Sequence, residues 1–159
     1  MLSFYRLIWL LPIAFVLHLI EEYGTGYPAY AGAVTGYPMA LPMFLGPNLL
    51  FVAIMALLTA WAAKAKSPAA VFWMLAWAAG NEFWNFVYHL LAVPAHDRHS
   101  PGLITGALVY LPLSLAIWQA ALAEKVTGCK PLAAAIALGG VFMALVAAVG
   151  IYHIGGIGA

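Results

Sequence analysis

Residues 7–22 read LIWLLPIAFVLHLIEE, an apolar run that ends on one histidine and two glutamates. The run is too uniformly apolar for a helix that keeps one face in water. A helix crosses a hydrocarbon core roughly 30 Å thick with about 20 apolar residues, so this stretch and its flanks suffice for one crossing. We predict a first membrane-spanning helix over residues 4–22.

The rest of the chain has the same character. Of its 159 residues, 66% are hydrophobic and 7% are charged, whereas roughly a quarter of the residues of a soluble domain are charged. Further apolar runs stand at residues 46–63, 69–93, 101–123 and 131–153. The predicted fold is therefore all-α, with residues 1–159 forming one domain, a bundle of five transmembrane helices.

The breaks between the runs combine charges with helix-breaking or capping residues. At the fourth run, Ser100 and Pro101 fit the N-cap and the first helical position. Residues 1–22 also have features of a signal peptide, with Arg6 before the apolar run and a loose Ala-Gly-Ala cleavage site at 31–33. Because glutamates rather than small residues follow the run directly, we expect the first helix to be retained.

The basic residues predict the orientation, because short cytoplasmic loops carry the excess of Lys and Arg. With the amino terminus in the cytoplasm, that side carries Arg6, Lys64, Lys66, Lys125 and Lys130, and only Arg98 lies opposite. We predict a multi-pass protein of the cell (inner) membrane, with the bilayer as a partner and the carboxyl terminus outside. The net charge of +1 without a basic cluster excludes a nucleic-acid partner.

The connection over residues 23–45 is unlike a solvated loop. It contains no charged residue, is rich in Tyr, Pro and Gly, and repeats the sequence Thr-Gly-Tyr-Pro at 25–28 and 35–38. One interpretation is an apolar outer loop whose tyrosines lie in the aromatic belt at the membrane surface. The other is a lid over a site below it.

Polar side chains concentrate at the predicted outer end of the first span. Ionisable residues inside spans are costly and indicate functional sites. His18, Glu21 and Glu22 stand at positions i, i+3 and i+4, so the imidazole can share a helix face with either carboxylate. The simpler interpretation is that the two glutamates mark the water boundary.

The third span carries a second polar group. Glu82, Asn85 and His89 follow one stripe at i, i+3 and i+7, and Asn81 precedes them. At a rise of 1.5 Å per residue, Glu82 lies about 10 Å deeper than His89. An unpaired carboxylate at this depth would be costly, so Glu82 requires a partner or a proton.

All five histidines fall on the predicted outer side, although Lys and Arg alone set the orientation. Histidine and carboxylate ligands suit zinc or iron, and catalytic zinc commonly has three protein ligands and one open position. We therefore predict a divalent metal, zinc or iron. The candidate ligands are His18, Glu21, Glu22, His89, His99 and His153. His96 and Asp97 are interpreted as solvated turn residues.

The catalytic candidates are Glu82 and Glu22. We expect Glu82 either to orient His18 or His89 through a hydrogen bond or to act as an acid-base group. Asn81 and Asn85 are candidates for supporting hydrogen bonds around the ligands.

At His18-Leu-Ile-Glu21-Glu22 the sequence resembles the HXXEE family of bacterial and archaeal membrane proteins, which is named for this motif. A further histidine, here resembling His89, and a Tyr-x-Pro-Gly motif also mark the family. The second motif resembles Ser100-Pro101-Gly102, with His99 at the tyrosine position, either as a ligand or in place of the hydroxyl. The resemblance covers nearly the full length and implies these site residues, but no reaction, because the family has no settled function.

Three functions fit the residues. The first is a metal-dependent enzyme, a hydrolase or an iron oxidoreductase, that acts on a lipid-like small molecule at the outer side of the membrane. The second is a metal-free isomerase or cyclase that uses Glu82 and His18 as acid and base. The third is a non-enzymatic metal-binding, transport or structural subunit whose polar groups hold helices together.

Overall fold

The computed structural model describes residues 2–148, and every regular element in this range is helical. The predicted all-α class is thus confirmed for these residues. In chain order the α-helices and the two π-helices, η1 and η2, are α1 (Phe4–Leu7), α2 (Leu10–Gly24), α3 (Tyr27–Thr35), α4 (Leu41–Ala65), α5 (Pro68–Met74), η1 (Leu75–Gly80), α6 (Asn81–His96), α7 (Leu103–Thr105), η2 (Gly106–Tyr110), α8 (Leu111–Ala123) and α9 (Cys129–Val146).

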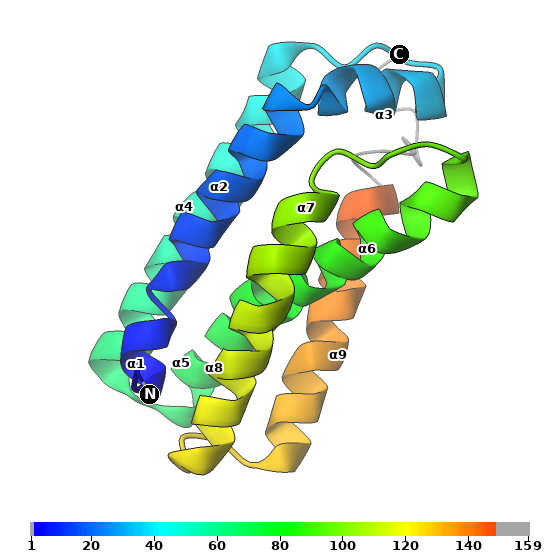
Figure 1. The fold of residues 1–159 in the computed structure, drawn as a ribbon. Coiled ribbons are helices and arrows are strands. Elements are labelled where there is room, and N and C mark those ends of the chain that lie inside the picture. The colour runs from blue at the N-terminus through cyan, green and yellow to red at the C-terminus, as the bar shows by residue number, and fades with distance from the viewer. Residues whose placement is uncertain (1, 149–159) are drawn as a thin grey trace.

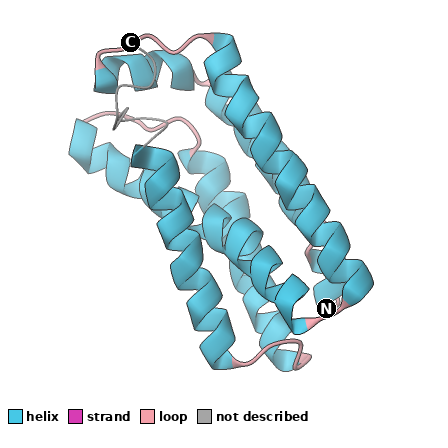
Figure 2. Cartoon of the chain, turned by 180° about the vertical axis from the view of Figure 1, so that it is seen from behind, coloured by secondary structure: helices cyan, strands magenta, loops and turns pink. Residues whose placement is uncertain are grey.

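The long helices run side by side, and α3 lies across one end of the bundle (Figure 1). The view from behind has the same arrangement (Figure 2). The amino terminus and the turns α4–α5 and α8–α9 lie at the other end (Figure 1). The HXXEE motif lies at the end of α2, beside α3. It is therefore far from the lysines at the two turns, which stand at positions 64, 66, 125 and 130.

Four helical segments are long and apolar enough to cross a membrane, namely Phe4–Gly24, Leu41–Ala65, Leu103–Ala123 and Cys129–Val146. Their outward surface is apolar: the side chains of Leu57 and Leu108 are 70% and 73% exposed. Such a surface is suited to lipid rather than water. The chain is therefore described as a membrane protein with four candidate spans.

The predicted third span, residues 69–93, is also helical, through α5, η1 and α6. It is not among the four candidate spans, since Asn81, Glu82 and Asn85 lower its hydropathy. Five crossings therefore stay a prediction.

Several predicted boundaries differ from the structure. The 23–45 connection contains the helix α3, and α4 begins at Leu41 rather than at residue 46. The fourth helical segment begins at Leu103, because Gly102 has a φ of +99° that no α-helix accommodates. Ser100 and Pro101 thus precede the helix and do not start it. The predicted end of the last span, at residue 153, lies outside the described residues.

The helices η1 and α9 are in close contact. A Cβ atom added to Gly139 would lie 2.7 Å from the carbonyl carbon of Gly80, a distance that real Cβ atoms do not adopt. The neighbouring Ala76, Ala79 and Ala135 are fully buried. Small residues let membrane helices approach in this way, and this contact holds the base of α6 against α9.

Candidate metal centre

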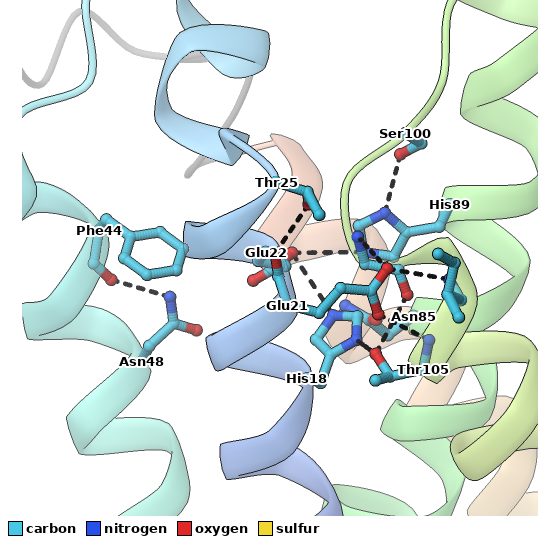
Figure 3. A network of polar contacts seen from close by, with 12 residues as sticks. His18, Glu21, Glu22, Thr25, Phe44, Asn48, Asn85, His89, Ser100 and Thr105 are labelled. Atoms are coloured by element: carbon cyan, nitrogen blue, oxygen red, sulfur yellow. Dashed lines mark hydrogen bonds and ion pairs between the residues drawn. The ribbon is translucent and has the colours of Figure 1, made fainter.

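Three predicted ligands converge where α2 meets α6 (Figure 3). His18 and Glu22 lie one helical turn apart on α2, and His89 comes from α6. The Glu22 Oε1 atom lies 3.4 Å from His18 Nε2 and 3.3 Å from His89 Nε2. All three ligand atoms lie within 4.8 Å of one another, and at most 6% of each residue is exposed.

The other nitrogen of each imidazole is held by a hydroxyl group. His18 Nδ1 lies 2.8 Å from Thr105 Oγ1, and His89 Nδ1 lies 2.8 Å from Ser100 Oγ (Figure 3). The Thr105 hydroxyl also donates to the carbonyl oxygen of Gly102 at 3.4 Å. The two hydroxyl contacts orient the rings so that each Nε2 atom points toward Glu22.

Where Nε2 carries a lone pair, it and the carboxylate oxygen are two acceptors, which repel each other unless a cation lies between them. A charge-assisted N–H···O bond would bring nitrogen and oxygen to about 2.7–2.9 Å, closer than the 3.3 and 3.4 Å found here. Ligands placed tetrahedrally about 2.0–2.1 Å from zinc are about 3.4 Å apart. The spacing therefore suits three ligands of one metal ion.

Glu21 has different partners from those of Glu22. Its carboxylate accepts three backbone N–H bonds, from Gly102 at 3.2 Å, Ile104 at 3.1 Å and Thr105 at 2.6 Å. A carboxylate in this position satisfies the free amides at the start of α7. Glu21 thus anchors the segment that supplies the hydroxyl group to His18, and it lies outside the group of three ligands.

Gly102 is packed against both imidazole rings. A Cβ atom at this position would lie 2.6 Å from His18 Cε1 and 2.9 Å from His89 Nε2. The φ of +99° also favours glycine. Glycine is therefore required here twice, for its backbone conformation and for the absence of a side chain.

The three candidate ligands border a cavity of about 120 Å³. Its other walls are mainly apolar and include Met39, Met43, Phe44 and Met143. This space leaves further coordination positions open, which is typical of a catalytic rather than a structural site. It also favours an apolar ligand with one polar end.

Tyr27 of α3 lines the same cavity, and its ring centroid is 6.2 Å from that of His89. Burial raises the pKa of the Tyr27 phenol well above its usual range, and the neighbouring Tyr88 and Glu22 raise it further. The phenol therefore stays protonated at physiological pH and can donate a hydrogen bond.

Glu82 does not orient either histidine through a hydrogen bond in the structure, since the hydroxyls of Thr105 and Ser100 occupy that position. Glu82 is 1% exposed, and neither carboxylate oxygen has a hydrogen-bond partner among residues 2–148. A buried carboxyl without a counter-charge favours its protonated form. Its expected role as an acid-base group stays a prediction.

The two asparagines lie at different places. Asn85 lines the cavity and donates to the sulfur of Met143 at 3.9 Å. Asn81 is buried, and its side-chain nitrogen has no hydrogen-bond partner in the described part of the chain. Neither asparagine is hydrogen-bonded to the candidate ligands in the described part of the chain, so their supporting role stays a prediction.

His96 and His99 lie outside the group of three ligands. His99 is exposed, His96 is half-buried against Tyr30 at a ring distance of 6.2 Å, and Asp97 is exposed. Among residues 2–148 the group that could hold a metal contains none of them. The predicted ligand His153 lies outside the described residues.

Sequence reasoning missed the contributions of Thr105, Ser100 and Tyr27. A threonine inside an apolar run gives no signal of its own, and Ser100 had the pattern of a helix cap. Tyr27 belongs to the segment singled out as a possible lid, but nothing in its sequence distinguishes it from the other tyrosines.

Residues 9–117, more than half of the chain, match the family described as proteins of unknown function with an HXXEE motif. No curated protein and no solved structure matches the chain. The match includes His18, Glu21, Glu22, His89 and the segment Ser100-Pro101-Gly102.

Proposed function

The chain belongs to the HXXEE family, whose function is unknown, and we propose that it is a membrane-embedded, metal-dependent hydrolase of a lipid-like substrate. The observation that carries this proposal is the shared orientation of His18 Nε2 and His89 Nε2 toward Glu22 Oε1, at 3.4 and 3.3 Å. Hydroxyl groups hold both rings at their Nδ1 atoms, and ligand histidines are usually held in this way at the nitrogen that does not bind the metal.

We also propose five crossings, with α5, η1 and α6 together as the third. The amino terminus is then cytoplasmic, and the metal centre lies near the outer surface. Five of the six basic residues support this orientation.

The proposed chemistry is the addition of water to an ester or amide. The acyl carbon gains a hydroxyl group, its bond to the leaving oxygen or nitrogen breaks, and a proton from water passes to the leaving group. A divalent metal activates water and polarises the carbonyl in such sites. Tyr27 is suited to donate a hydrogen bond to the developing oxyanion, because its phenol lines the cavity in protonated form.

Oxidation of the lipid-like substrate by dioxygen at an iron ion is a second candidate reaction. Two histidines and one carboxylate with open positions are also the ligand set of non-haem iron oxygenases. We take zinc as the first candidate because hydrolysis needs no redox change at the metal.

Metal analysis of the purified protein tests the ligand set. We expect about one zinc per chain in the wild type and none in His18→Ala or His89→Ala. His99→Ala, which removes an exposed histidine outside the group, is the matched control and should keep its metal. A wild type purified without metal, or loss of metal in His99→Ala alone, would contradict the ligand set.

Lipid mass spectrometry tests the reaction. Cells that express the wild type or His89→Ala are compared, and the species that differ are identified. Products that gain the elements of water indicate hydrolysis, whereas products that gain oxygen or lose hydrogen indicate the iron reaction. Identical lipids would contradict an enzymatic role and leave metal binding alone.

A further inference from the structure

An open apolar groove of about 560 Å³ lies between α6 and α9, next to the cavity of the candidate metal centre. Large side chains of α6 form one wall, and mainly small residues of α9 form the other. We infer that this groove binds a hydrocarbon chain of the substrate while the polar end of the substrate lies in the cavity. The inference rests on the proposed function and names the substrate class more closely.

The groove lies beyond a close contact between η1 and α9. At Gly80 and Gly139 the backbones are in contact, with a Cβ on Gly139 only 2.7 Å from Gly80. Beyond this point α6 leans away from the other long helices (Figures 1 and 2). Ala137, Gly140 and Ala144 of α9 line the resulting space and are too small to fill it.

The α6 wall offers mainly apolar surface to a ligand. Trp84, Val87 and Leu91 stand at i, i+3 and i+7 and line the groove. The indole nitrogen of Trp84 already donates to the carbonyl oxygen of Ile136 at 2.9 Å, so the exposed part of the ring is carbon. Seven residues at 1.5 Å each give a wall about 10 Å long, parallel to the helix axis.

The groove adjoins the cavity of the candidate metal site. Tyr88 and Met143 line both the groove and the cavity, and Tyr88 is adjacent in sequence to the candidate ligand His89. These two side chains are therefore the boundary that a chain lying along α6 has to pass to reach the metal centre. Methionine is flexible enough to adapt the junction to different ligands.

A second apolar groove provides an internal comparison. It lies between α2 and the η2–α8 segment, has a volume of about 300 Å³, and includes Ile13, Leu17, Leu108 and Val109. None of its lining residues borders the cavity. Both grooves offer apolar surface to the membrane, but of the two only the groove between α6 and α9 shares lining residues with the cavity of the candidate ligands.

Photolabelling tests the inference. The wild type is placed in vesicles of phosphatidylethanolamine and phosphatidylglycerol that contain a phospholipid with a photoactivatable group near the end of one acyl chain. Labelled peptides are identified by mass spectrometry. We expect labels on α6 and α9 at the groove. Ala144→Trp should reduce them about tenfold, the effect of losing contact with about two methylene groups.

Leu145→Trp is the matched control, because Leu145 follows Ala144 on α9, is 55% exposed, and lies outside the groove. It should keep wild-type labelling. Equal labelling of Ala144→Trp and the wild type would overturn the inference, as would cross-links that join two copies of the chain through this face of α9.

Metal content measured on the same samples separates the two proposals. His18→Ala should lose its metal and keep the label in the groove. Protein with metal but without groove labelling refutes the inference alone, and protein with groove labelling but without metal refutes the proposed metal site alone.

Discussion

Glu21 and Glu22 are neighbours in sequence, but their carboxylates have different partners. We expect Glu22→Gln to abolish metal binding, because the atom between the two imidazoles is a candidate ligand. Glu21→Gln removes the charge that accepts three amides and should weaken metal affinity by about 10–100-fold. Metal titration of both variants checks this difference, and an equal loss in both would contradict the separate roles.

Gly102→Ala should damage both folding and metal binding. A side chain at a φ of +99° costs about 1–3 kcal/mol, and its Cβ would lie 2.6 Å from the His18 ring. Denaturant unfolding in detergent and metal analysis measure the two effects. Gly24→Ala is the control, because nothing lies within 4 Å of the added Cβ. Wild-type stability and metal content in Gly102→Ala would refute the tight packing described for this loop.

At the residue level, helical spacing predicts His18 and His89 as candidate ligands, because the outer ends of the first and third spans meet. The choice between Glu21 and Glu22 could not be predicted. Adjacent residues on a helix point about 100° apart, and either one can share a face with His18. The position of the Gly102 segment, a tertiary contact between distant parts of the chain, decides which carboxylate faces the imidazoles.

At the level of elements, α3 is a docked helix rather than an exposed loop. Three alanines on it differ in accessibility: Ala31 is 1% exposed, whereas Ala29 and Ala33 are exposed. In a Cys129→Ser background, Ala31→Cys should react with a maleimide at least about tenfold more slowly than the other two cysteine variants. Ala31 becomes accessible only when α3 moves away from the bundle, and an opening free energy of about 1.4 kcal/mol is sufficient for this difference in rate.

Uniformly fast reaction of all three cysteines would instead indicate a solvated segment without a fixed face. The helix was not predicted because its composition resembles that of a loop. In the structure these residues have specific places: Gly26 and Gly36 adopt positive φ values at the two ends, and Pro28 lies in the first turn. A proline at the start and a glycine after the end are compatible with a short helix.

For the whole molecule, the number of crossings determines on which side each turn lies. Cys129 is exposed at the α8–α9 turn. With five spans, native Cys129 should resist a membrane-impermeant maleimide in intact cells and react after permeabilisation. Asp97→Cys in a Cys129→Ser background should react in intact cells. If α6 does not complete a crossing, both results reverse, so labelling distinguishes five spans from four.

Composition predicts the all-helical membrane fold well, because apolar surfaces such as Leu57 and Leu108 have no other suitable solvent. It predicts the third crossing less well. The same polar residues that indicate a site, above all Glu82, also lower the hydropathy that identifies a span. A segment that both crosses the membrane and carries a polar site is difficult to assign from its sequence alone.

The π-helix η1, Leu75–Gly80, directly precedes the helix that carries His89. A π turn holds about one residue more than an α turn, so it rotates all that follows by about 100°. Replacing one apolar residue of η1 by another of similar size preserves this rotation. If the segment became a regular α-helix with the same number of residues, His89 would turn away from His18 and Glu22. Deletion of one residue together with that change would leave the direction of His89 nearly as it is, so the direction of this ligand depends on the π geometry and the length of η1 together.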